Sequence, residues 1–288
     1  MKILITGSYG QLGRSLLESF KIYNFEIIQT GRNISIREDG IRLDIQDSIN
    51  IKAILDLHTP DIIINLAAMT NVDMCEKQPF LAKEVNIGGV INICDNFKGK
   101  ILHLSTDYVF DGKNGPYTET DKVAPVSIYG QTKLAAEQII MNHNPDNLII
   151  RGNVLYDYTL YTKASFLNWV LDSLKNNRTI RVVDDQFNNP TWTKSMADII
   201  CLCVKNDISG IYHWGDADFV SRYEFAQIIA KKYDFDNSLI NPVSTNELSQ
   251  IAPRPLKSGL ISDKIINILD VIPPSIEDCL SGISKKIE

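Results

Sequence analysis

The sequence predicts an α/β protein built on a doubly wound parallel sheet. Short apolar segments alternate with helical patterns from the N-terminus to about residue 155, and this alternation is typical of parallel strands joined by helical crossovers. The first apolar segment, residues 2–6, runs directly into a glycine-rich turn at 7–13, and a helical pattern follows. A strand, a glycine turn and a helix start form the phosphate cradle of Rossmann-type dinucleotide sites.

The composition limits the classes of protein to which this chain can belong. The chain has 288 residues, of which 44% are apolar and 22% charged, enough for one large domain or two modest ones. A net charge of −6 argues against a nucleic-acid partner, which would need clustered lysines and arginines. No apolar run reaches membrane-spanning length, and the first glycine follows Met1 too soon for a signal peptide.

Cysteine and histidine spacing indicates no metal site. The five cysteines are scattered, Cys201-x-Cys203 lacks the usual zinc spacing, and the four histidines show no ligand pattern. We therefore expect buried, reduced thiols in a cytoplasmic protein.

Three glycines of the 7–13 turn have separate tasks in a dinucleotide cradle. Gly7 permits the tight turn, Gly10 lets the pyrophosphate approach the backbone, and Gly13 lets the helix pack close to the strand. The spacing is G-x-x-G-x-x-G, and a plain glycine-rich turn between strand and helix is the alternative.

The second strand, residues 26–30, bears on cofactor choice. An NAD site usually places an acidic residue at the end of this strand, whereas this chain has Arg32 in that region. A guanidinium suits a 2′-phosphate, so NADP(H) is favoured, with NAD(H) or a plain surface arginine as alternatives. A third strand is expected at 41–45, where Asp44 either accepts a hydrogen bond from the adenine amine or caps the helix that starts near Asp47.

The next two strands lead to the reaction site. The strand at 61–68 ends in the small residues Ala67 and Ala68, which leave room for a cofactor or pack against a helix. A helix is expected over 80–97. The strand at 100–106 ends in hydroxyls, and because ligands of open α/β sheets bind at carboxyl strand ends, Thr106 is expected to hydrogen-bond a substrate carbonyl.

A tyrosine and a lysine four residues apart follow this strand. On a helix, Tyr129 and Lys133 would share one face, one turn apart. A phenol titrates near pH ~10, and a neighbouring ammonium would stabilise the phenolate and make the phenol a better acid at neutral pH. The lysine could also reach the ribose of a nicotinamide cofactor. An ordinary solvated helix face is the alternative for an isolated pair.

The rest of the chain adds a second region. Strands are expected at 148–151, 179–183 and 210–214, and helices at 163–176, 193–205 and 221–233. A rigid turn at 252–255 precedes a short helical tail. No long linker separates the halves, so we expect an NAD(P)-binding domain at 1–155 with a returning segment at about 186–212, and a substrate-binding region at 156–185 and 213–288.

The chain resembles the extended short-chain dehydrogenase/reductases, and within them the dTDP-4-dehydrorhamnose reductase family. The motifs that carry the resemblance are GSYGQLG at 7–13, STDYVFDG at 105–112, YGQTKL at 129–134, DDQ with PT at 184–191, SRYEFA at 221–226 and APRP at 252–255. They extend over most of the chain.

The resemblance implies a catalytic set of Thr106, Tyr129 and Lys133. Thr106 would position the C4 carbonyl, Tyr129 would donate the proton as NADPH delivers hydride, and Lys133 would hold the ribose and lower the phenol pKa. It implies a cofactor site that includes Gly10, Gln11, Leu12, Asp44, Ile45, Ala67, Ala68, Met69 and Asn86. It places Asp107, Val154 and Arg254 beside a nucleotide sugar, and it allows a homodimer.

Two departures fall in the substrate half. The family usually reads RTSWVYG after the sixth strand, where this chain has RGNVLYD at 151–157, so Val154 replaces an aromatic platform. Asn188 stands where the family has glycine. Because a nucleotide sugar is anionic and the chain is acidic, local arginines are expected to bind it, with Arg151, Arg178 and Arg254 as candidates.

Three hypotheses follow. The first is NADPH-dependent reduction of a nucleotide-linked 4-keto-6-deoxy sugar in glycan synthesis. The second is epimerisation or dehydration of a nucleotide sugar, although Thr106-Asp107 lacks the glutamate pair expected of the dehydratases. The third is a regulatory subunit like that of methionine adenosyltransferase, since fold alone does not settle function.

Overall fold

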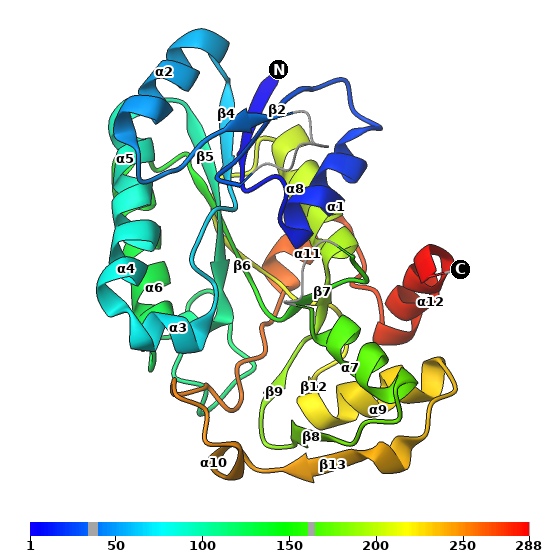
Figure 1. Ribbon diagram of the computed structural model, residues 1–288. Coiled ribbons are helices and arrows are strands. Elements are labelled where there is room, and N and C mark those ends of the chain that lie inside the picture. Colours follow the sequence, from blue (N-terminus) through cyan, green and yellow to red (C-terminus); the bar gives the residue numbers. More distant parts are fainter. Residues whose placement is uncertain (34–39, 161–164, 288) are drawn as a thin grey trace.

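A seven-stranded parallel sheet forms the centre of the computed structural model, which describes residues 1–33, 40–160 and 165–287 (Figure 1). The spatial order is β3 (Ile41–Arg42), β2 (Glu26–Gly31), β1 (Lys2–Thr6), β4 (Ile62–Asn65), β5 (Lys100–Thr106), β6 (Leu148–Gly152) and β11 (Gly210–Trp214). All neighbouring pairs are parallel. The order reverses between β1 and β4, which makes this the switch point of a doubly wound sheet. The predicted fold class is confirmed.

Helices cover both faces of the sheet. Helices α1 (Gln11–Phe20), α8 (Thr193–Lys205) and α11 (Asp263–Leu269) pack on one face, and α2 (Ser48–His58), α5 (Gly89–Asn96) and α6 (Ile128–His143) on the other. Residues 62–65 of β4 are all buried, as expected for a parallel strand enclosed on both faces. The continuous apolar runs of the sequence follow from this double burial.

Several elements differ from their predicted limits. The strand expected at 41–45 spans only Ile41–Arg42, and the one expected at 61–68 ends at Asn65. The helix expected at 80–97 consists of α4 (Pro79–Lys83), the π-helical turn η1 (Glu84–Gly88) and α5. Helix α7 (Phe166–Lys175) lies within the helix expected at 163–176, of which residues 163 and 164 are outside the described residues.

A second core lies beside the sheet. It joins α7, α9 (Arg222–Lys232) and α12 (Ile276–Ile287) to the parallel pair β8 (Ile180–Val183) and β13 (Ile240–Val243). Side chains of α11 pack on the first core instead. The remaining short elements are α3 (Val72–Lys77), η2 (Asp107–Val109), β7 (Leu155–Tyr156), β9 (Phe187–Asn188), β10 (Thr191–Trp192), β12 (Val220–Ser221), η3 (Asn237–Leu239) and α10 (Thr245–Leu248).

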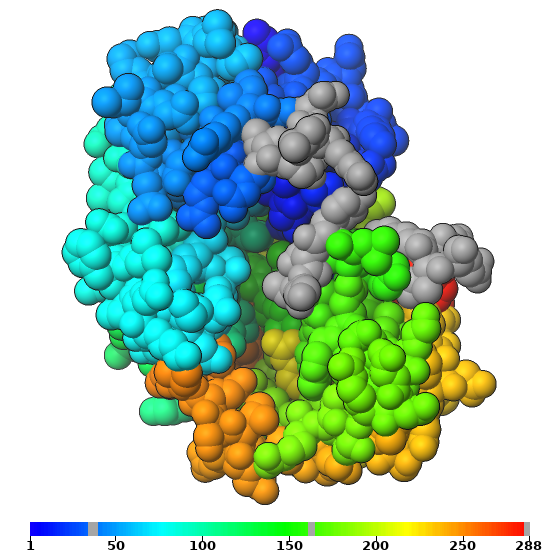
Figure 2. Space-filling model, viewed as in Figure 1, coloured from blue at the N-terminus to red at the C-terminus, as the bar shows by residue number. Residues whose placement is uncertain are grey.

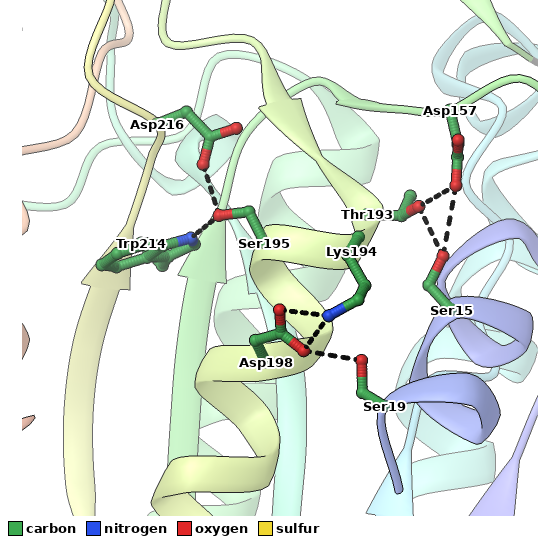
Figure 3. Close-up of polar contacts among 9 residues, drawn as sticks. All are labelled: Ser15, Ser19, Asp157, Thr193, Lys194, Ser195, Asp198, Trp214 and Asp216. Atoms are coloured by element: carbon green, nitrogen blue, oxygen red, sulfur yellow. Dashed lines mark hydrogen bonds and ion pairs between the residues drawn. The ribbon is translucent and has the colours of Figure 1, made fainter. Parts of the chain in front are cut away.

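Buried polar contacts hold the two cores together (Figure 3). The hydroxyls of Ser15 on α1 and Thr193 on α8 lie 2.6 Å apart, and both donate to the carboxylate of Asp157, which follows β7. Ser19 of α1 donates to Asp198 of α8 at 2.8 Å. The Asp157 contacts fix the chain after β7, and with it the start of the second region, against the face of the sheet that carries α1 and α8. The contact of Ser19 with Asp198 joins α1 to α8 within the first core.

Within the described residues, no helix is long and apolar enough to cross a membrane. All five cysteines are buried and unpaired, as expected from the sequence.

Candidate active site

The glycine turn after β1 approaches the chain after β4 closely. Gly7 has φ +72°, and a Cβ there would lie 3.2 Å from the backbone nitrogen of Ala67. A Cβ on Gly13 would lie 2.5 Å from the carbonyl oxygens of Gly7 and Ser8. Only glycine fits at these two positions without displacing backbone, and the predicted tasks of both residues agree with this geometry.

Helix α1 begins without a side-chain cap. Its N-cap is Gly10, and its first turn holds no acidic residue. The neighbouring helices α2 and α6 are capped by the side chains of Asp47 and Ser127. The first N–H groups of a helix need an acceptor and favour an anion. The turn and the uncapped helix therefore fit the pyrophosphate of a dinucleotide.

Asn86 lies in the π-helical turn η1, where it organises the loop after β4. Its side-chain oxygen accepts the N–H of Met69 at 2.7 Å, and its amide donates to the Met69 carbonyl at 3.1 Å. The same amide donates to the hydroxyl of Thr132 on α6 at 3.0 Å. Single π turns occur frequently at functional sites. Asn86 thus joins the loop containing Ala67, Ala68 and Met69 to the helix of the predicted catalytic pair.

The other predicted cofactor residues have varied surroundings. Arg32 follows β2 and is exposed. Asp44 accepts the N–H of Gln46 at 3.1 Å. The alternative that Asp44 caps the next helix is wrong, because Asp47 caps α2. Ile45 and Leu12 are buried, and the Gln11 amide donates to the Asp157 carbonyl.

The predicted catalytic residues come from β5 and α6. Thr106 ends β5 and is 6% exposed, and its hydroxyl donates to Asp107 at 3.0 Å. Tyr129 and Lys133 lie one turn apart near the start of α6. Burial raises the pKa of Tyr129, and a hydrogen bond with Thr106 acts in the opposite direction. The structure therefore brings the threonine and the phenol together at the carboxyl end of the sheet.

The amine of Lys133 is buried behind this pair. It donates to the carbonyl of Leu104 at 2.6 Å and lies 2.9 Å from Nε2 of His103. Burial lowers the pKa of Lys133 to about 8, against the charge of Glu137, which raises it. The other ring nitrogen of His103, Nδ1, lies 3.0 Å from Nδ2 of Asn65. Sequence reasoning missed His103, although a lone histidine in an apolar strand was a visible signal.

The residues assigned to the substrate lie along the same edge. Asp107 is 1% exposed and accepts hydrogen bonds from Thr106 and Ser258, and burial raises its pKa to about 6. Val154 is half-buried with φ +34°, a region that β-branched residues rarely adopt. Arg254 pairs with Asp73 of α3 at 2.8 Å. The interaction with Ser258 links the chain near the APRP turn to the end of β5.

Two of the expected anion-binding arginines are engaged elsewhere. Arg151 forms a buried two-point ion pair with Glu137, at 2.9 and 2.7 Å. Arg178 is exposed and pairs with Asp172. Arg254 also has a carboxylate partner, Asp73, so all three arginines are paired and their predicted role in binding an anionic substrate stays a prediction. Arg254 differs from the other two in that its Nε is buried and has no acceptor among the described residues.

The face in Figure 2 is hollowed in its middle, between the cyan segment that carries α3 and α4 and the green segment that carries α7. A separate cavity of about 620 Å³ lies beside α1 and is lined by Gln11, Ser15, Trp192, Lys194 and Gly282 among others. Because no predicted catalytic residue lines that cavity, the geometry at the ends of β5 and α6 locates the site better.

The described residues hold no cluster of three or more His, Cys, Asp or Glu suited to a metal.

Comparison with known proteins identifies the family. The model of the RmlD substrate binding domain family matches residues 1–287. The chain belongs to this family. A family relative, the dTDP-4-dehydrorhamnose reductase of Aggregatibacter actinomycetemcomitans, is 32% identical, and the match covers 98% of each chain.

Other similar proteins differ in their described roles. The crystal structure of dTDP-4-dehydrorhamnose reductase from Bacillus anthracis in complex with NADP superimposes with a TM-score of 0.90 at 29% identity, covering 99% of both chains. Methionine adenosyltransferase 2 subunit beta from Xenopus tropicalis is 29% identical over 93% of this chain and 82% of that protein. The RmlD family match therefore fixes the fold and leaves both catalytic and regulatory relatives for comparison.

Proposed function

We propose that the protein reduces the keto group of a nucleotide-linked 4-keto-6-deoxy sugar with NADPH. The observation that carries this proposal is the grouping of Thr106, Tyr129 and Lys133 at the ends of β5 and α6. The uncapped start of α1 lies at the adjacent switch point of the sheet. The named activity of the reductase relatives supports the same reaction.

Each residue has a distinct part in the proposed reaction. NADPH, when bound, supplies the hydride that adds to the carbonyl carbon. The Thr106 hydroxyl donates a hydrogen bond to the carbonyl oxygen and orients it beside the phenol. Tyr129 transfers its proton to that oxygen, and the positive charge of protonated Lys133 stabilises the phenolate that remains. Because burial raises the pKa of Tyr129, the phenol holds its proton until the oxygen becomes basic.

Cofactor preference follows from Arg32. Its position just after β2, with no acidic residue at the strand end, suits the 2′-phosphate of NADPH. NADH would bind with the same nicotinamide geometry and without that contact. The family resemblance extends the proposal to a cytoplasmic enzyme that associates as a homodimer.

The competing function is a regulatory subunit that binds the cofactor without turnover. The similarity to methionine adenosyltransferase 2 subunit beta favours this alternative. The presence of the hydroxyl, phenol and amine together favours the enzyme, because a regulatory subunit has no need of a proton donor beside the cofactor. Epimerisation with tightly held NAD is a third function that the same residues would allow.

A substrate panel distinguishes these functions. NADPH oxidation is measured with dTDP-4-dehydrorhamnose and with the corresponding UDP and GDP 4-keto-6-deoxy sugars. Turnover with one of them, accompanied by a stoichiometric hydroxyl product, is the expected result. NADPH binding without turnover across the panel would favour the regulatory function, and interconversion of epimers without net NADPH consumption would favour the epimerase.

A further inference from the structure

Two arginines flank one short stretch of backbone beside the substrate half of the site. The backbone N–H of Arg222, the first residue of α9, donates to the Gln186 carbonyl at 3.1 Å. On the other side of this stretch, Phe187 donates to Leu256 at 2.6 Å and accepts from Ser258 at 2.9 Å. Strand β9 therefore lies between β12, which leads to Arg222, and the segment that begins at Arg254.

Within the described parts of the chain, the guanidinium of Arg222 has no hydrogen-bond acceptor and no ion pair. It lies over the ring face of Phe166, 5.2 Å from the centroid. The nearby carboxylate of Asp107 already accepts from Thr106 and Ser258. A guanidinium carries five N–H donors, so a half-buried arginine in this state has donors to offer a ligand.

Two features of its position make the positive charge of Arg222 unfavourable. It occupies the first turn of α9, where the helix dipole disfavours a cation. Burial, together with repulsion from nearby Arg254, lowers the pKa of Arg222, while Tyr108 and Asp107 act in the opposite direction. One guanidinium nitrogen of Arg254 pairs with Asp73, but its Nε is buried and has no acceptor among the described residues. Arg222 and the Nε of Arg254 therefore leave N–H donors that an anion could accept.

We propose that Arg222 and Arg254 together bind the diphosphate of the nucleotide sugar, with Arg222 as an affinity-determining residue. This inference rests on the proposed function. A diphosphate offers several oxygens in the planar, two-point geometry that guanidinium groups recognise. Both arginines lie near Tyr108, whose ring packs edge-on against Tyr129 at 5.6 Å. The diphosphate is thereby placed beside Tyr108, whose neighbour Tyr129 is the proposed proton donor.

The test compares a nucleoside diphosphate with its nucleoside. The full-length protein is titrated calorimetrically with dTDP, UDP and GDP, and the tightest of these is then compared with its nucleoside. The variants are Arg222→Gln, Arg222→Lys and, as matched control, Arg178→Gln, which removes an exposed arginine of the same region. Thermal unfolding and NADPH affinity report whether each variant is folded.

We expect Arg222→Gln to weaken the diphosphate about 10- to 100-fold, the range for one lost charge-assisted contact, and to change nucleoside affinity less than twofold. Arg222→Lys should recover part of the loss, and Arg178→Gln should bind as the wild type does. The proposal is overturned if Arg222→Gln loses the same affinity for the nucleoside as for the nucleoside diphosphate. It is also overturned if the wild type binds none of the three diphosphates more tightly than the matching nucleoside.

Turnover separates this proposal from the proposed function. If sugars turn over with unchanged KM in Arg222→Gln, the diphosphate assignment fails and the reductase stands. If diphosphate binding depends on Arg222 but no sugar turns over in the wild type, the diphosphate site stands and the reductase fails.

Discussion

Nζ of Lys133 lies 2.9 Å from Nε2 of His103, and this contact connects the predicted catalytic helix to the interior of the sheet. The chain of contacts continues from Nδ1 of His103 to the amide of Asn65, whose oxygen accepts from the Thr6 hydroxyl at 2.6 Å. Burial of this amine lowers the pKa of Lys133 to about 8, so the amine remains largely protonated at neutral pH, the form that would stabilise a phenolate.

The first prediction concerns His103. Leucine at this position removes the polar partner that fixes the amine, so we expect kcat/KM for reduction to fall about tenfold or more, since misplaced catalytic groups are costly. His103→Gln keeps a polar group near the position of Nε2 and should recover much of the loss. Steady-state kinetics on both variants, with unfolding curves as a check, measure this. Equal activity of the two variants would show that the contact has no positioning role.

A second prediction uses the pH dependence of stability. The pKa of Lys133 is about 8 in the folded protein and about 10.4 in an unfolded chain. Between these pH values the unfolded chain holds a proton that the folded protein has released, so the contribution of Lys133 to stability increases as pH rises from about 8 to about 10.4. The contribution is lost again as pH falls back to about 8. The unfolding free energy of the wild type, minus that of Lys133→Met, should rise by up to about 3 kcal/mol across the window.

Urea unfolding between pH 7 and 10.5 measures this difference, and Lys264→Met is the control, since Lys264 is exposed. If the unfolding free energy of the wild type, minus that of Lys133→Met, stays constant or falls with rising pH, the lowered pKa of Lys133 is contradicted.

The third prediction concerns the buried ion pair of Glu137 and Arg151. Glu137→Ala leaves a buried guanidinium without its carboxylate and should cost about 3–5 kcal/mol of unfolding free energy. The double variant Glu137→Leu with Arg151→Met removes both charges and should recover most of that loss. Asp172→Asn, which breaks the exposed pair with Arg178, should cost less than about 1 kcal/mol. Urea unfolding at neutral pH compares the three, and similar losses for the buried and exposed pairs would contradict this account.

Local pattern is enough to predict the sheet and much of the site. Residues 2–6, the glycine turn and α1 adjoin one another in sequence, so their geometry follows from turn chemistry and periodicity. The tyrosine and lysine are predicted on one helix face because a four-residue spacing fixes that relation. The N-terminal capping serine of α9 is likewise a local signal, and the structure shows its full capping box.

Long-range pairing explains what the sequence does not predict. Arg151 is an ordinary strand residue until α6 brings Glu137 against it, so no local pattern shows that its charge is already balanced. Arg222 stands out in the sequence only as part of a motif. That it has no carboxylate partner among the described residues depends on long-range contacts, because the nearby Asp107 accepts from Thr106 and Ser258 instead. The π turn at Asn86 has no periodicity of its own, and its residues fit a continuous helical pattern.

The most direct test of the account is the rate of NADPH oxidation by Tyr129→Phe in the presence of a reactive 4-keto sugar. Tyr212→Phe is the matched control, because it removes the same hydroxyl from a ring in the sheet core. We predict that Tyr129→Phe lowers kcat about 100- to 10,000-fold, the usual contribution of general acid catalysis, with NADPH affinity nearly unchanged, and that Tyr212→Phe retains wild-type kcat. A Tyr129→Phe enzyme whose kcat stays within about threefold of the wild type would contradict the role of Tyr129 as proton donor.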